Sequence, residues 1–155
     1  MRRGFGFNAR ASRSSLTCAM SRHYVWMKSD TPPKCKLAPW EKASRVAEAE
    51  KLLSSFYRPR FVLPRPTNPS FNYIVGFSAG WHGAYLRFNV RYACPDPNAL
   101  SPFFELPFAR LGYFGGRDCY NLWARRHNDQ WIVLAEDLTL PSAFAEMQTN
   151  PWFQF

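Results

Sequence analysis

The sequence predicts a single α+β domain: an N-terminal helix, a five-stranded antiparallel β-meander and a short C-terminal helix, over residues 40–155. Three observations predict it. Apolar residues first recur at helical spacing, then alternate with other residues along several short segments, and these segments are joined by connections too short for parallel pairing. A chain of 155 residues that is 46% hydrophobic has enough apolar material for one packed core.

The first helix is predicted to begin at Pro39, because proline suits the first turn of a helix. We expect it to end at Arg58, since Pro59 disfavours the helical conformation in the residue before it. The stretch 59–69 carries four prolines and predicts an extended linker. The apolar positions of the helix are Trp40, Ala43, Val46, Ala47, Leu53, Phe56 and Tyr57.

Five segments then read as strands: about 71–78, 85–92, 104–114, 118–125 and 130–134. The second alternates most clearly, so we expect Leu86, Phe88 and Val90 to face the core and their neighbours to face outward. Glycine-bearing or polar turns separate the strands, including one at 79–83 and one at Gly115-Gly116.

A last helix is expected after Thr139, whose side chain suits an N-terminal cap, with Pro141 in its first turn. Asn150-Pro151 is predicted to end it. Three aromatic residues at the C-terminus fall outside the periodic pattern, and they could pack on the domain or on a partner. They are Trp152, Phe153 and Phe155.

The C-terminal half resembles a small bacterial α+β domain family of unknown function. The resemblance is carried by 107–113, by Tyr120-Asn121-Leu122-Trp123, by Arg125-Arg126, by Gln130-Trp131, and by Asn150-Pro151 with Phe153. It implies a compact domain in the bacterial cytosol, and it supplies no catalytic residue to transfer.

The net charge of +9 is concentrated at the N-terminus. The leader, residues 1–39, holds eight Lys/Arg against one Asp, which gives +7; the remaining residues carry +2. We expect this basic leader to be flexible. Its Arg-rich, acid-poor composition is also typical of a targeting segment, and a third possibility is a mis-annotated start, with translation beginning at Met20 or Met27.

Catalytic and metal chemistry find little support. The four cysteines, Cys18, Cys35, Cys94 and Cys119, form no CxxC pair, and neither they nor the histidines at 23, 82 and 127 have partners at metal-ligand spacing. No phosphate loop, nucleophile elbow or dinucleotide fingerprint is present. We therefore expect no metal and no cofactor. The sequence favours a binding domain over an enzyme, but it leaves an enzyme open as a further alternative, since a catalytic triad is assembled in space from separate segments. Well-separated cysteines and the lack of an apolar run of about 18 residues favour a cytoplasmic protein outside the membrane.

The sequence leaves one candidate site, the outward face of the sheet. It would combine arginines with aromatic and amide side chains: Tyr85, Arg87, Asn89, Arg91, Arg110, Asn121, Trp123 and Arg125. Single-stranded nucleic acid binds such surfaces by base stacking on aromatic rings and by phosphate contacts to arginine. An antiparallel sheet also commonly leaves a polar face to solvent with no ligand. The third interpretation is a protein-interaction module, as a homodimer or with another partner, that has no role with nucleic acid.

Overall fold

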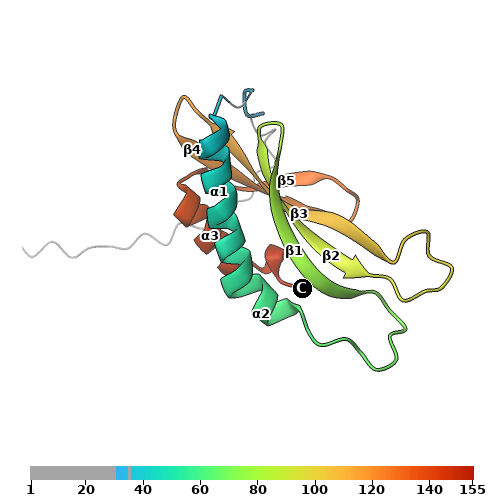
Figure 1. Cartoon of the computed structure of the whole chain (residues 1–155). Coiled ribbons are helices and arrows are strands. Elements are labelled where there is room, and N and C mark those ends of the chain that lie inside the picture. Colours follow the sequence, from blue (N-terminus) through green and yellow to red (C-terminus); the bar gives the residue numbers. More distant parts are fainter. Residues whose placement is uncertain (1–30, 35) are drawn as a thin grey trace, which may run out of the picture.

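The computed structural model describes residues 31–34 and 36–155, so the expectations for the first thirty residues of the leader lie outside the described residues. Helices cover one face of a single antiparallel sheet of order β1-β2-β3-β4-β5 (Figure 1). This confirms the predicted fold class. The elements are α1 (Pro39–Leu52), the π-helical turn η1 (Leu53–Tyr57), α2 (Arg58–Phe61), β1 (Tyr73–His82), β2 (Tyr85–Ala93), β3 (Phe103–Phe114), β4 (Cys119–Arg125), β5 (Trp131–Leu138), α3 (Leu140–Thr149) and the 3₁₀ turn η2 (Pro151–Phe153).

The first helix does not end at Arg58 as predicted, because a π-helical turn accommodates Pro59. A proline ring clashes with the carbonyl four residues before it and has no N–H to donate. Widening the helix over Leu53–Tyr57 removes this conflict: the Arg58 N–H bonds to the Leu53 carbonyl, five residues back. The helix therefore continues to Phe61 before the linker begins.

The core lies between the helices and the inner face of the sheet. As predicted, Leu86, Phe88 and Val90 are buried on this face of β2. A β-bulge where β3 pairs with β2 brings both Phe108 and Ala109 into the core, since Phe88 pairs with Ala109 while the next pair is Asn89 with Pro107.

The strand β1 extends four residues further than predicted, through Ala79 to His82. Only Gly83 in this connection has a positive φ, of 61°. Ala79 and Trp81 pack against the core, and the Trp81 indole N–H donates to the Lys42 carbonyl at 3.1 Å. The sequence predicts a turn at 79–83 because of the glycines there. Contact with α1 instead keeps residues 79–82 extended.

The C-terminal helix forms as predicted, with the Thr139 side chain accepting from the Ser142 N–H. Near its end, the Met147 carbonyl has no helical donor four residues on, because residue 151 is proline. The buried Tyr57 hydroxyl donates to this carbonyl at 2.9 Å. Phe153, one of the three unassigned aromatics, is fully buried, whereas Trp152 and Phe155 remain about half exposed.

Candidate functional site

The strand register places all eight predicted site residues on the outer face of the sheet, opposite the helices. Arg87 pairs with Arg110, and Arg110 pairs in turn with Trp123. These three side chains therefore form a row across β2, β3 and β4. Whether the face binds nucleic acid stays a prediction, but its geometry can be followed residue by residue.

The centre of this face is a second hydrophobic cluster, built around Trp123. That ring is only 4% exposed, and it packs with Phe114 and Cys119 under the partly buried Tyr85, Trp131 and Val133. The Tyr85 ring meets the Trp123 ring edge-on at 5.6 Å between centroids. Trp123 therefore offers no open ring face on which a base could stack.

Gly112 allows the chain to approach Trp123 this closely. A Cβ atom at this position would lie 2.7 Å from the Trp123 ring and 2.9 Å from the Pro32 ring. Such distances are closer than atoms pack in protein interiors, so any side chain here forces its neighbours to move. Pro32, at the end of the leader, is itself buried against this part of the outer face.

The guanidinium of Arg110 is surrounded by aromatic rings. Its Cζ lies 4.2 Å from the Tyr85 ring centroid, 4.5 Å from that of Trp131 and 5.2 Å from that of Trp123. Cation–π attraction to these rings holds the charge in place. Burial lowers the pKa of Arg110, and the charge of Arg87 lowers it further against the opposing effect of Tyr85.

The Arg87–Arg110 pair is electrostatically unfavourable in this structure. Like charges placed directly opposite on neighbouring strands repel each other. The Nε atoms of both arginines are buried and have no hydrogen-bond partner in the part of the chain that the structure describes. Among the described residues, the ion pairs that form lie elsewhere, such as Arg58–Glu50 and Arg117–Asp137. Arginine guanidiniums form strong charge-assisted hydrogen bonds with phosphate and carboxylate groups, so this pair is a candidate anion site.

Some of the other predicted residues are exposed, and others are already held by an ion pair or by hydrogen bonds. Arg91 is exposed, with its Cζ 4.7 Å from the centroid of the 42%-exposed Phe103 ring. Asn89 is partly buried beside it. Arg125 is held in an ion pair with Asp129 at 2.7 Å.

Asn121 is 2% exposed and joins β4 to β5. Its amide nitrogen donates to the Glu136 carboxylate at 3.3 Å, and its oxygen accepts from the Asp137 N–H at 3.0 Å. The β4–β5 register shifts at Asn121, between Tyr120 and Leu122, and again between Leu122 and Trp123. These hydrogen bonds hold β5 against β4 where the regular backbone hydrogen bonding between the two strands is interrupted.

Sequence reasoning missed the aromatic residues Phe103 and Trp131, which complete this face. Alternation in the fifth strand could have revealed Trp131, since it lies two residues before Val133 and both point to the Trp123 side. Phe103 was harder to recognise, because it is the first residue of β3 and lies before the clear alternation begins.

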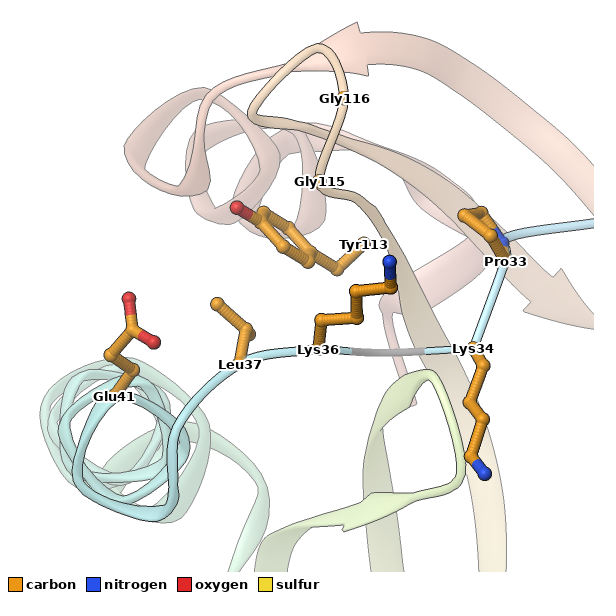
Figure 2. Close-up of a pocket in the computed structure, with 8 residues that line it drawn as sticks. All are labelled: Pro33, Lys34, Lys36, Leu37, Glu41, Tyr113, Gly115 and Gly116. Atoms are coloured by element: carbon orange, nitrogen blue, oxygen red, sulfur yellow. The ribbon is translucent and has the colours of Figure 1, made fainter.

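A separate hollow of about 440 Å³ lies at the start of α1, between the end of the leader and the β3–β4 turn (Figure 2). Lys36 points toward its Tyr113 side and Lys34 points away. Two of its polar groups already have partners. The Glu41 carboxylate accepts from the Ala38 N–H at 2.8 Å, and the Tyr113 hydroxyl donates to Asp118 at 2.8 Å. Burial and this hydrogen bond raise the pKa of Tyr113 to about 12.

Within residues 31–34 and 36–155, no three His, Cys, Asp or Glu side chains come together as metal ligands. Cys119 lies in the second hydrophobic cluster, where burial raises the pKa of its thiol. None of the described helices is both long and apolar enough to cross a membrane.

Comparison with known proteins gives the chain a family. The model of DUF3024, a domain of unknown function, matches residues 37–155, and the chain belongs to this family. The match begins just before α1 and includes every strand. It therefore extends well beyond the C-terminal half, whose motifs carry the resemblance described above. No curated protein and no solved structure matches the chain.

Proposed function

We propose that the outer face binds a single-stranded nucleic acid, with phosphates at the arginines. The observation that carries this proposal is the Arg87–Arg110 pair, two arginines directly opposite each other on β2 and β3 that form no ion pair with a carboxylate of the described residues. Opposite residues in an antiparallel pair have Cα atoms about 4.5–5.5 Å apart, so both arginines can reach one phosphate. Binding would relieve the repulsion between them.

A third arginine, Arg91, favours an extended polyanion over a small anion. Arg91 lies four residues along the strand from Arg87, which corresponds to about 13 Å. One phosphate cannot contact both ends of such a row. A chain of phosphates can, and the exposed Phe103 ring beside Arg91 supplies a surface for a base. In this arrangement the buried Trp123 positions Arg110 and does not stack on bases.

Titration of the full chain with a labelled single-stranded oligonucleotide at several salt concentrations tests this proposal. Each phosphate contact that is lost should flatten the slope of log K against log salt by about 0.7. We expect this change for Arg87→Gln and for Arg91→Gln, whereas Phe103→Ala should weaken binding with little change in slope. Lys51→Gln, on the exposed side of α1, removes the same charge from the opposite layer and is the matched control.

If Arg87→Gln and Lys51→Gln weaken binding equally, the interaction is an unspecific attraction to net charge and the proposal is wrong. A variant that begins at Trp40 separates the contribution of the leader. Affinity that disappears with the leader and is insensitive to Arg87 would assign the binding to the basic segment alone.

The alternative proposal is a protein-interaction module. It is favoured by exposed aromatic residues away from the arginines, among them Trp40 at 73% and Phe71 at 85% exposure. Light scattering combined with the 260/280 absorbance ratio distinguishes the two. A dimer without nucleic acid supports the interaction module, and a monomer that carries nucleic acid supports the sheet face.

A further inference from the structure

A cleft of about 860 Å³ opens beside the other face of the sheet, far from the Arg87–Arg110 pair along the strands. It lies where the end of α2 and the proline linker approach the first residues of β1, the end of β2 and the C-terminal tail. Figure 1 shows these segments together near the C-terminus. The side chains that give the cleft its chemical character are Arg60, Phe61, Ile74, Tyr92 and Phe155.

The floor of this cleft is aromatic and fixed by the core. The Phe155 ring packs on Phe61, Phe77 and Phe108 with centroid distances of 5.4, 5.6 and 5.1 Å. It is nevertheless 46% exposed, so part of a large apolar side chain is left in water. An apolar ligand that covered this surface would be stabilised, because it would remove apolar area from water.

One wall carries a hydrogen-bond donor. Tyr92 is held by stacking on Phe104, with centroids 5.2 Å apart and planes 17° from parallel. Its hydroxyl, like that of any tyrosine, is protonated at neutral pH and can donate, and burial raises its pKa further. The opposite wall is the proline linker, which has fewer backbone donors than an ordinary segment.

The rim is positively charged. The Arg60 Cζ lies 5.2 Å from the Phe56 ring centroid and 5.8 Å from that of Phe61. Its neighbour Arg58 is neutralised by Glu50 at 2.7 Å, but the ion pairs of the described residues do not include Arg60. No Asp or Glu of residues 31–34 and 36–155 lines the cleft. The cleft therefore combines an apolar interior with one unneutralised arginine.

We propose that this cleft binds a small amphipathic carboxylate, with its apolar body on Phe155 and Ile74 and its carboxylate at Arg60. The volume falls within the roughly 300–1,000 Å³ of small-molecule sites. Its lining of eleven residues is about half of what one side of a standard protein interface uses. A small molecule is thus a better occupant than a protein surface, and the basic rim selects an anionic head group.

Dodecanoate, kept below its micelle concentration, is a suitable probe for calorimetric titration of the full chain. Dodecanol has the same apolar body without the charge. We expect dodecanoate to bind with one-to-one stoichiometry and at least ten times more tightly than dodecanol. Arg60→Gln should weaken dodecanoate about tenfold and leave dodecanol unchanged, since it removes a charge-assisted hydrogen bond. Arg65→Gln, five residues along the linker and outside the cleft lining, is the matched control and should change neither.

Filling the cleft with a larger side chain tests whether the apolar body of the ligand binds there. Ile74→Trp should abolish binding of both probes, but Ile74 also packs on the core, so its thermal unfolding must be compared with the unmodified chain. Asn72→Trp, at an exposed lining position, fills the cleft from its rim without touching the core and should act in the same direction.

Absence of dodecanoate binding, or equal binding by Arg60→Gln and the unmodified chain, would overturn the proposal. So would concentration-dependent dimerisation that Asn72→Trp abolishes, because the cleft would then be a contact between two copies. The dodecanoate results leave the outer-face proposal unaffected, since it rests on different residues and a different ligand.

Discussion

The two faces of the sheet bury aromatic residues in different ways. On the inner face, Phe88 is fully buried under a layer of helices. On the outer face, Trp123 reaches almost the same degree of burial without a helix above it, under Tyr85, Trp131 and the guanidinium of Arg110. The comparison shows that a sheet face can be closed by its own long side chains. Such a cover contains a charged group, the guanidinium of Arg110.

The largest expected effect tests the inner face. Phe88→Ala should lower the free energy of unfolding by about 3–5 kcal/mol, because it leaves a cavity under the helices. Its outward-facing neighbour provides the control: Asn89→Ala should change stability by less than about 0.5 kcal/mol. Urea denaturation measures both. Similar costs for the two variants would mean that the faces do not differ as the structure indicates.

Gly112→Ala tests how tightly the outer face is closed. The added methyl group would lie 2.7 Å from the Trp123 ring, so we expect a loss of about 1–3 kcal/mol in the free energy of unfolding. Gly80→Ala is the matched variant on the same face, where the space above the glycine is open and the change should be neutral or slightly stabilising. If Gly112→Ala were as harmless as Gly80→Ala, the outer cluster would be loosely packed.

The stability of the protein at alkaline pH tests the burial of Tyr113. Because the pKa of Tyr113 is raised to about 12 from 10, the folded state holds this proton more tightly than the unfolded state. Its contribution is complete below pH 10 and is lost as the pH rises toward 12. Tyr113→Phe should make this decline shallower, while changing stability below pH 9 by about 1 kcal/mol or less. An unchanged decline in a pH series of urea midpoints would contradict the assignment.

The smallest expected effect concerns the leader. We propose that the folded unit begins near α1, so trypsin should cut at the exposed Lys34 and Lys36 and leave about 37–155 intact. Loss of Pro32 from the outer cluster should cost the fragment less than about 1 kcal/mol. Resistance of these two lysines to cleavage would show that the leader is part of the domain.

The sequence by itself determined what depends on local periodicity. Alternation in 85–92 identified the inward and outward sides of β2, and Thr139 with Asn150-Pro151 marked the limits of α3, because cap chemistry and side-chain period act over a few residues. The same alternation found the arginines of the outer face. The alternation pattern could not predict which side chains beside these arginines would be buried, since burial depends on side chains from other strands.

The tertiary structure decided the rest. From the sequence, Pro59 was expected to end the first helix and Gly80 to lie in a turn. Instead, the helix continues beyond Pro59 through a π-helical turn, and β1 continues through Gly80 because Trp81 is hydrogen-bonded to α1. Trp123 read as an exposed platform and is buried by residues that lie up to 38 positions away in the chain, such as Tyr85. The cleft at Arg60 also needs the linker, two strands and the C-terminus to meet. Contacts between distant segments have no local signature, because they form only when the whole sheet and its helices pack together.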